Sequence, residues 1–585
     1  MLTSFTGSTA RSKFLLGFVA AIMAVFVMRL FYLQVVQHGY YVDKAYQTQV
    51  SKLTIMPERG KIYAMDGTGT VPLVLNETVY TAFADPQEVK DPAKIMATFR
   101  SVAGGNLVRG YEERLYDKKS RYVPIAKQLT RTQADMIRKK ELAGVGLQKG
   151  MRRVYPEASM ASQLLGYVND EGKGQYGIEG ALDSRLEGMP GILRTVTDVR
   201  QIPLTIGQND IHQEAVDGDD LVLTIDRNIQ LRAEQILRDG LKKAEATKGS
   251  VLVMDPNTGA VLAMANYPTY DPSKYTEVDN YAVFQNGTVT DPYEAGSVIK
   301  TLTMGAGLDS GAVSTQSTFD NTGAVHVDDT TIRNVEEDPI FPNTTMTDVL
   351  QYSLNTGVVY VLQQMGGGNV NKEAREKLYD YFVNHYRFGK KTGIEQAGEA
   401  EGIIIGPNQG VGRNVRYANM TFGQGMNVTM IQTAAAFSAS VNGGTYFQPH
   451  LVKGTLDRAG IIKETQPKVV AQNVLTPKTS ADLTEMIYQG RHKGFFGKSD
   501  PAGYRVGGKT GTSQVIDPKT GKYSNDNSIG SYIGFGGSDA PRYVIMVRVE
   551  DSKLKTGYAG TVAAGPIFNE LSNWMLSYLE IKPKI

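Results

Sequence analysis

The sequence predicts a multidomain α+β protein that carries a single transmembrane helix near its N-terminus. Three features predict this organisation: an apolar run over residues 14–36, a region broken by glycine and proline over residues 37–247, and strand hairpins joined to helices over residues 248–585. A chain of 585 residues has room for several domains, since a domain usually holds roughly 100 to 200 residues.

Composition narrows the range of functions. The formal net charge is +2 and no dense basic run occurs, which argues against a protein that binds nucleic acid. The absence of cysteine excludes disulfides, thiolate metal sites and cysteine nucleophiles, and is compatible with export into an oxidising space. The six histidines are scattered without the HxxxH or HExxH spacing of a metal site. We therefore expect neither a metal nor a cofactor.

The apolar run over residues 14–36 is interrupted only by Arg29 and Gln34. A tilted helix of this length would cross the hydrocarbon core of a bilayer. Arg29 lies near one end of the run, where its long side chain can reach the interface. The run therefore predicts a retained membrane anchor, although a cleaved signal peptide and a buried core helix give similar patterns.

Basic residues predict the orientation of this anchor. Arg11 and Lys13 lie directly before the run, and positive charge next to a membrane span favours the cytoplasmic side. We therefore expect residues 1–13 in the cytoplasm and everything after Val36 outside.

The region after the anchor divides into two parts. Residues 37–247 contain short strands and helices between turns and show no catalytic constellation, so they are predicted to form a non-catalytic pedestal. The composition changes near Gly249, where two apolar strands flank a turn at Asp255–Gly259. A second hairpin over residues 532–547 and a helix over residues 564–579 follow. Sheet and helices together predict an α+β or α/β catalytic domain at residues 248–585.

Three short motifs in this second part predict a serine acyl-transfer site. They are Ser297-Val-Ile-Lys300, Ser353-Leu-Asn355 and Lys509-Thr510-Gly511-Thr512. A hydroxyl is a poor nucleophile at neutral pH, and a lysine one helical turn later can act as its base when the charge of that lysine is suppressed. The order and spacing of the motifs thus predict the mechanism, serine acyl transfer, but do not identify the substrate.

Each motif alone is weak, because the chain repeats all three. Ser552 begins a second SxxK, Ser440 begins a second SxN, and Lys-Thr-Gly recurs at Lys391, Lys519 and Lys555. Context favours one set: Gly296-Ser297 can open a helix with Lys300 on the same face, and residues 505–515 can run as a glycine-rich strand.

The same strand also contains a misleading pattern. Residues 503–510 match the phosphate-binding pattern GxxxxGK[ST], which requires a helix directly afterwards. Gly511, Pro518 and Gly521 interrupt the next stretch, so phosphate binding is not expected. A Ser-His-Asp triad has little support, since no GxSxG elbow occurs.

With these motifs the chain resembles the class B penicillin-binding proteins, the monofunctional D,D-transpeptidases that cross-link peptidoglycan. The resemblance covers nearly the whole chain and rests on segments throughout it: Arg29–Val35, Arg59-Gly60, Gly177–Glu179, Tyr293–Ser297, Ser353–Gly357, Phe388–Ile394 with Gly398-Glu399 and Gly402, Phe422–Gly425 and Asn442–Gly444. The chain departs from the family pattern at Ala295 and Ile299. These two differences affect how the helix packs locally. Ser353-Leu-Asn355 is more similar to the cell-division (septal) branch than to the elongation branch.

The resemblance implies a fold and a set of roles. It implies an elongated, dimerisation-like pedestal and a β-lactamase/transpeptidase-like domain with an antiparallel sheet flanked by helices. Ser297 would attack the D-Ala-D-Ala carbonyl while Lys300 takes its proton, and the backbone N–H groups of Ser297 and Thr512 would form the oxyanion hole. Ser353 would relay a proton to the leaving D-alanine.

The remaining roles concern substrate binding. Asn355 would orient Lys300 and the amide of the donor peptide. Thr510, Gly511 and Thr512 would form the substrate-binding strand, whose two threonines bind the substrate carboxylate with help from the charge of Lys509.

The resemblance also implies partners and a location. The partners would be peptidoglycan stem peptides, lipid-linked precursors, β-lactam antibiotics, a membrane-embedded glycan polymerase and division proteins. The protein would be single-pass in the bacterial cell membrane. Two alternatives use the same motifs: a β-lactamase or D,D-carboxypeptidase, which delivers water to the acyl-enzyme, and a non-catalytic penicillin-binding sensor or scaffold.

Overall fold

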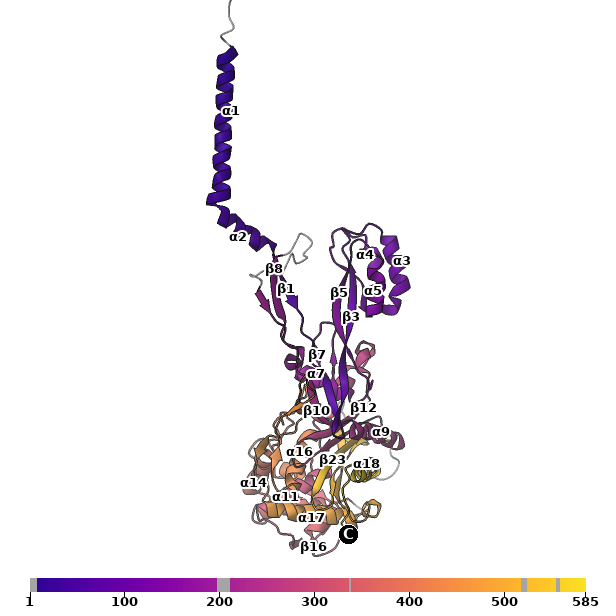
Figure 1. Ribbon diagram of the computed structural model, residues 1–585. Coiled ribbons are helices and arrows are strands. Elements are labelled where there is room, and N and C mark those ends of the chain that lie inside the picture. The colour runs from indigo at the N-terminus through magenta and orange to yellow at the C-terminus, as the bar shows by residue number, and fades with distance from the viewer. Residues whose placement is uncertain (1–7, 197–210, 336–337, 517–522, 554–557, 585) are drawn as a thin grey trace, which may run out of the picture. The chain divides into compact units, whose positions relative to one another are not determined.

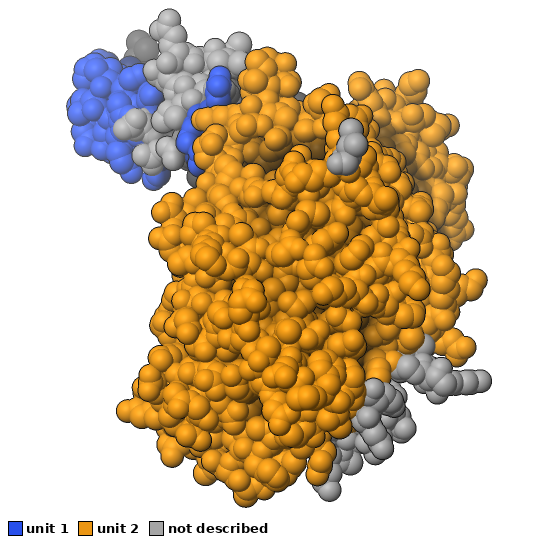
Figure 2. Space-filling view, turned by 90° about the horizontal axis from the view of Figure 1, so that it is seen from below, with its two compact units in different colours: residues 1–59, 187–218 blue, residues 60–186, 219–585 orange. Residues whose placement is uncertain are grey.

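The computed structural model describes residues 8–196, 211–335, 338–516, 523–553 and 558–584. The chain forms two compact units (Figure 2). One unit comprises residues 1–59 and 187–218, and the other comprises residues 60–186 and 219–585.

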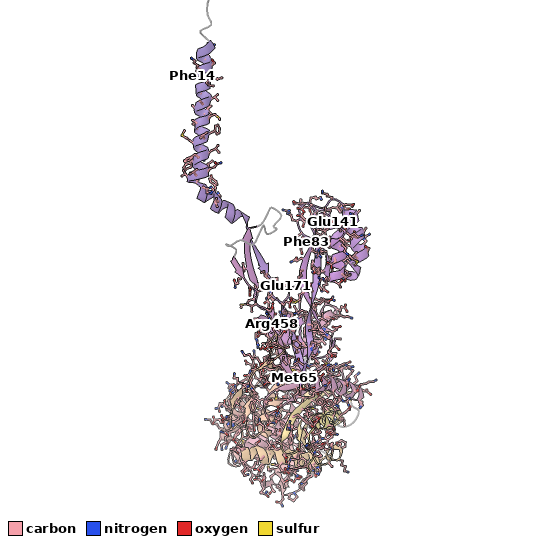
Figure 3. All side chains as sticks on the ribbon, in the orientation of Figure 1. Phe14, Met65, Phe83, Glu141, Glu171 and Arg458 are labelled. Carbon is pink, nitrogen blue, oxygen red and sulfur yellow. The ribbon has the colours of Figure 1, made fainter. Side chains whose placement is uncertain are left out.

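The first unit contains the predicted anchor. Helix α1 (Ser8–Phe31) continues through a π-helical turn, η1 (Tyr32–Val36), into α2 (His38–Gln49). Side chains of α1 such as Phe14 project away from the helix and are exposed (Figure 3). Within the described residues, only Arg11–Val36 has the length and hydropathy of a membrane span. Strands β1 (Val50–Ile55), β8 (Gly191–Val196) and β9 (Ile211–Gln213) form an antiparallel sheet in the order β1-β8-β9.

The second unit begins with a seven-stranded sheet that joins segments distant in sequence. Strands β19, β18, β10, β2, β3 and β4 lie in this order, and β5 also pairs with β3. Their bounds are β2 (Ile62–Asp66), β3 (Gly69–Ala84), β4 (Val123–Leu129), β5 (Val145–Val154), β10 (Leu221–Asp226), β18 (Val452–Leu456) and β19 (Ile462–Glu464). Helices α3 (Pro92–Val102), α4 (Tyr111–Arg114) and α5 (Arg131–Arg138) lie beside β3 and β5 (Figure 1) and share a small apolar core with them.

A five-stranded antiparallel sheet forms the centre of the C-terminal part. Its order is β12-β11-β23-β22-β21, so β21 is an edge strand. The strands are β11 (Lys248–Met254), β12 (Val261–Tyr267), β21 (Arg505–Ile516), β22 (Tyr523–Gly537) and β23 (Pro541–Glu550). The two hairpins expected from the sequence, β11-β12 and β22-β23, are both present.

Helices cover both faces of this sheet. Helices α9 (Arg227–Lys243) and α18 (Gly565–Tyr578) pack on one face and bury an apolar core there. The opposite face contributes to the larger core, together with α11 (Lys300–Asp309), α13 (Asn355–Met365), α16 (Met430–Val441) and α17 (Pro477–Lys493). This second face carries the predicted site.

Shorter elements complete the unit. The helices are α6 (Ser162–Leu165), α7 (Gly177–Ala181), α8 (Asp183–Glu187), α10 (Gly287–Thr290), α12 (Met346–Gln351), α14 (Lys372–Asp380) and α15 (Arg413–Met420). The strands are β6 (Tyr167–Val168), β7 (Gly174–Gln175), β13 (Thr318–Phe319), β14 (Ala324–Val327), β15 (Thr330–Arg333), β16 (Thr344–Thr345), β17 (Tyr446–Phe447) and β20 (Val469–Ala471).

Candidate active site

The candidate nucleophile lies at the start of a helix, as its context predicts. Ser297 is half-buried in a single 3₁₀ turn, η5 (Gly296–Ile299), which continues directly into α11. Gly296 has φ +66°, and a Cβ atom there would lie 2.8 Å from the carbonyl oxygen of Thr512. Glycine at this position therefore permits both the left-handed turn and the close approach of η5 to β21.

The residues before Ser297 are anchored by their surroundings. Tyr293 exchanges two backbone hydrogen bonds with Val428, its hydroxyl lies 3.2 Å from Ser531 Oγ, and the guanidinium of Arg548 lies 4.2 Å from its ring centroid. Glu294 Oε1 accepts a hydrogen bond from the backbone N–H of Gly425 at 2.7 Å. Sequence reasoning did not identify Arg548 or Ser531, because no short-range pattern relates them to the nucleophile.

Lys300 connects the first two motifs. Its side chain is only 1% exposed, and Nζ donates to Ser353 Oγ at 3.1 Å and also to the carbonyl oxygen of Ser353. Burial lowers the pKa of Lys300 well below its ordinary value, the Lys509 ammonium lowers it further, and the Asp338 carboxylate opposes both effects. The SxxK lysine is thus held in an environment that favours its neutral form.

Ser353 has an uncommon backbone conformation. Its φ is +60°, which a non-glycine residue adopts only when its surroundings compensate a cost of roughly 1 kcal/mol or more. The backbone N–H of Leu354 donates to the carbonyl of Val349, which ties this turn to α12. Asn355 begins α13, and its Nδ2 donates to the carbonyl oxygen of Arg333 at 2.9 Å.

The third motif lies on β21, the edge strand. Lys509 is 5% exposed, and its Nζ donates to the carbonyl oxygen and hydroxyl of Thr510 at 3.1 and 3.3 Å. Burial lowers the pKa of Lys509 to about 7, against the opposing effect of the Asp338 carboxylate. A Cβ atom at Gly511 would lie 2.8 Å from the carbonyl oxygen of Ala295, so glycine at this position allows the turn that carries Ser297 to approach β21 closely.

The two threonines of this motif lie on the other side of the strand. Side chains alternate along a strand, so Thr510 and Thr512 share one face and Lys509 and Gly511 the other, although Lys509 Nζ still reaches the Thr510 hydroxyl at 3.3 Å. Thr512 Oγ1 accepts a hydrogen bond from the backbone N–H of Gly560 at 3.2 Å. An edge strand also leaves one row of backbone groups able to pair with an extended peptide.

Several competing patterns have other structures. The segment that matches a phosphate loop continues as strand β21 to Ile516, so the helix that such a loop requires is missing from this stretch. Ser440 is fully buried within α16 and donates to the carbonyl oxygen of Ala436. Lys519 and Lys555, from the spare Lys-Thr-Gly sequences, lie outside the described residues.

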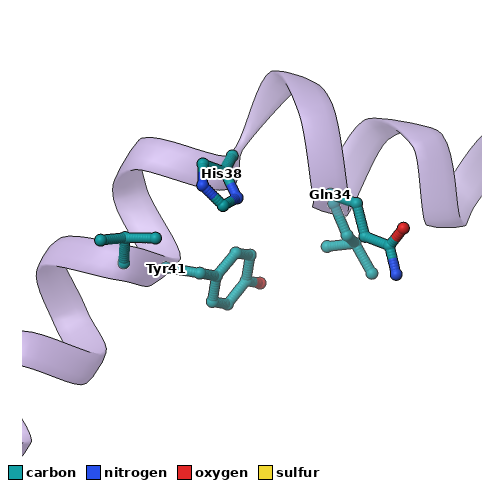
Figure 4. A pocket seen from close by; sticks show the side chains of 5 residues that line it. Gln34, His38 and Tyr41 are labelled. Carbon is teal, nitrogen blue, oxygen red and sulfur yellow. The ribbon is translucent and has the colours of Figure 1, made fainter.

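Two surface hollows lie away from these motifs. A hollow of about 480 Å³ is lined by Leu33, Gln34, His38, Tyr41 and Val42, where η1 turns into α2 (Figure 4). Another, of about 440 Å³, lies between the end of α11 and the start of α17. Neither is lined by a predicted catalytic residue. Within the described parts of the chain, no group of three or more His, Cys, Asp or Glu side chains could hold a metal ion.

Comparison with known proteins identifies the family. The Penicillin binding protein transpeptidase domain matches residues 249–573, which is more than half of the chain, and the Penicillin-binding Protein dimerisation domain matches residues 54–223. The chain therefore belongs to the penicillin-binding proteins, and its dimerisation and transpeptidase domains are those of class B. The predicted family and the α+β multidomain fold are thus confirmed.

Individual relatives agree with this family. The chain is 32% identical to Stage V sporulation protein D of Bacillus subtilis over 584 residues, which cover 98% of this chain and 86% of that protein. It is 28% identical to peptidoglycan D,D-transpeptidase FtsI of Escherichia coli, with 98% and 92% covered. The crystal structure of penicillin binding protein 2X from Streptococcus thermophilus has a TM-score of 0.71 at 22% identity, with 91% and 80% covered, and thus shares the fold.

Proposed function

We propose that this protein is a serine D,D-transpeptidase that cross-links peptidoglycan stem peptides ending in D-Ala-D-Ala, and that β-lactams acylate the same serine. The observation that carries the proposal is the buried amine of Lys300. Lys300 lies one turn after Ser297 and donates a hydrogen bond to Ser353 of the second motif. The charge of Lys509, from the third motif, helps to lower the pKa of Lys300. The names of the relatives, peptidoglycan D,D-transpeptidase among them, support the same activity.

The reaction begins with acylation. Neutral Lys300 takes the proton of Ser297 Oγ, which attacks the carbonyl carbon of the penultimate D-alanine and forms a tetrahedral intermediate. The C–N bond to the terminal D-alanine then breaks, and the leaving nitrogen receives a proton through Ser353. An ester remains between Ser297 and the donor peptide.

Deacylation completes the cross-link. The amine of a neighbouring stem peptide attacks the ester carbonyl, a new amide bond forms, and Ser297 recovers its proton. The backbone N–H groups of Ser297 and Thr512 would stabilise the oxyanion in both steps. The contact between Gly296 and the Thr512 carbonyl supports this role, because it places the two backbones beside each other.

Substrate binding uses the edge strand. Lys509, Thr510 and Thr512 would bind the carboxylate of the donor peptide or of a β-lactam, while Gly511 allows the peptide backbone to approach. Asn355 would accept a hydrogen bond from the donor amide or from Lys300.

The family match supports a wider assignment. We propose that residues 37–247 form the pedestal and residues 248–585 the transpeptidase domain. The apolar segment at residues 14–36 would anchor the protein in the cell membrane, with residues 1–13 in the cytoplasm and the catalytic domain outside. Lipid-linked precursors, a membrane-embedded glycan polymerase and division proteins would be its partners in septal wall synthesis.

Labelling with a fluorescent penicillin tests this function. The full chain in detergent should form a covalent adduct that peptide mapping places on Ser297, and Ser297→Ala should form none. A slowly hydrolysed adduct agrees with a transpeptidase, whereas rapid release of hydrolysed penicillin would indicate a β-lactamase. Persistent labelling of the Ala variant would disprove the assignment of the nucleophile.

A further inference from the structure

Helix α13 carries the second motif but does not cap its own N-terminus. Its N-cap residue, Leu354, has no side-chain capping bond. Instead, Oδ1 of Asn334, from the segment that follows β15, accepts hydrogen bonds from the backbone N–H of Thr356 at 2.9 Å and from the Thr356 hydroxyl at 3.1 Å. Asn334 therefore supplies from a distance the acceptor that an N-cap side chain usually supplies locally.

A second asparagine holds Asn334 in place. Asn321 is 1% exposed, and its Oδ1 accepts a hydrogen bond from Asn334 Nδ2 at 3.0 Å and lies 3.2 Å from the Thr356 hydroxyl. Its Nδ2 donates to the carbonyl oxygen of Pro339 at 2.9 Å. Both ends of each amide are therefore engaged, as a buried polar cluster requires.

The same segment also determines how Asn355 is turned. The carbonyl oxygen of Arg333, directly before Asn334, accepts the hydrogen bond from Asn355 Nδ2. With one of its two N–H donors bound there, Asn355 has a fixed amide orientation and keeps its oxygen as an acceptor for a further partner. The oxygen suits the role proposed above, because the N–H of the donor peptide and the Lys300 amine can both donate to it.

We propose that Asn334 is a positioning residue for the transpeptidase reaction, holding the start of α13 so that Ser353 and Asn355 keep their reacting orientation. This inference rests on the proposed function. Ser353 needs such support because it combines a left-handed backbone with a 3.1 Å bond from Lys300 Nζ to its hydroxyl. If the cap is lost, the turn can relax toward an ordinary conformation and move Ser353 Oγ away from Lys300.

Three variants test this role. Asn334→Ala removes the cap. Asn334→Asp keeps an acceptor for Thr356, and its charge suits a helix N-terminus, but it loses the donor to Asn321. Asn371→Ala is the matched control, because Asn371 caps α14 through the Ala374 N–H at 3.0 Å and donates to the carbonyl of Gly366 at 2.8 Å. It removes equivalent bonds from a helix without a predicted catalytic residue.

The measurement separates rate from stability. Stopped-flow acylation by a penicillin gives the dissociation constant of the non-covalent complex and the rate constant of acylation, and thermal unfolding gives Tm. We expect Asn334→Ala to lower the acylation rate constant about 10- to 100-fold, since small misplacements of reacting groups have effects of this size. The dissociation constant should change less. Asn334→Asp should restore the rate to within about threefold of the wild type, although its Tm stays lowered through the lost bond to Asn321.

The control decides between positioning and general stability. Asn371→Ala should lower Tm as Asn334→Ala does and leave the acylation rate constant unchanged. Equal rate losses in both alanine variants, or an unchanged rate in Asn334→Ala, would overturn the inference. Failure of the wild type itself to form an adduct on Ser297 would refute the proposed function instead, so the two failures are distinguishable.

Discussion

The two faces of the five-stranded sheet differ in character although the same strands build them. On the face toward α9 and α18, cross-strand neighbours such as Val251, Val547 and Tyr532 continue an apolar surface. Tyr532 packs there against Phe568 of α18 with the two rings tilted and their centroids 4.4 Å apart. Burial of such surface is the main source of folding stability.

The opposite face carries a polar row across four strands. Ser250, Arg548, Ser531 and Gly511 are successive cross-strand partners on β11, β23, β22 and β21. Three of them are buried polar side chains, and Arg548 and Ser531 contact Tyr293, which precedes the nucleophile turn. Burying polar groups costs stability unless they are paired. This row therefore indicates that the face serves to position the residues around the nucleophile turn. Changes on the two faces should therefore have separate effects.

The largest difference between the effect on acylation rate and the effect on stability is expected at Lys300. Lys300→Met should lower the acylation rate about 10²- to 10⁴-fold, the usual contribution of a positioned proton acceptor. Its Tm should not fall, because an apolar side chain of similar length replaces a buried polar amine whose charged form burial disfavours. Lys300→Arg is the informative partner: it keeps the charge but cannot lose its proton, so it should be equally slow. An active Arg variant would contradict the base role.

On the apolar face we expect the opposite result, a loss of stability without a loss of acylation rate. Phe568 is fully buried, and Phe568→Ala should lower the free energy of unfolding by about 3–5 kcal/mol through lost burial and a cavity. The acylation rate per folded molecule should remain that of the wild type. Phe495, which is 81% exposed, provides the control, since Phe495→Ala should be nearly neutral. Calorimetry and penicillin labelling below the unfolding transition measure the two quantities.

A pH profile tests the charges on the polar face. Acylation should rise with pH as Lys300 loses its proton, and fall as Lys509, whose pKa is about 7, loses the charge that binds the carboxylate. The Asp338 carboxylate favours the protonated form of both lysines. Asp338→Asn should therefore lower both pKa values and move both limbs of the kcat/KM profile to lower pH. An unchanged profile would show that Asp338 does not act on either lysine.

The smallest effect is expected at Tyr293. Tyr293→Phe removes the hydroxyl contact with Ser531 and keeps the ring beneath Arg548. The free energy of unfolding should fall by about 1 kcal/mol, and acylation should slow only a few-fold. Combining it with Ser531→Ala should add little further loss, because both variants remove the same bond. Additive losses would show that the two hydroxyl groups act independently.

Much of the fold was predictable from local patterns. The hairpins β11-β12 and β22-β23 follow short apolar runs on either side of a turn, and the helix predicted at residues 564–579 lies at α18 (Gly565–Tyr578). In contrast, Asn334 and Arg548 carry no local signal. Their importance comes only from contact with Thr356 and Tyr293, which are distant in the chain.

The sequence by itself determined the chemical groups and their short spacings: a serine with a lysine one turn later, a second serine with an asparagine, and a lysine on a glycine-rich strand. Only the tertiary structure decided that Lys300 meets Ser353, that β21 is an edge strand, and that Ser353 has a left-handed backbone. The physical reason is the distance along the chain over which each kind of interaction acts. Helix and strand patterns act between residues a few positions apart, whereas these three features depend on how whole elements pack.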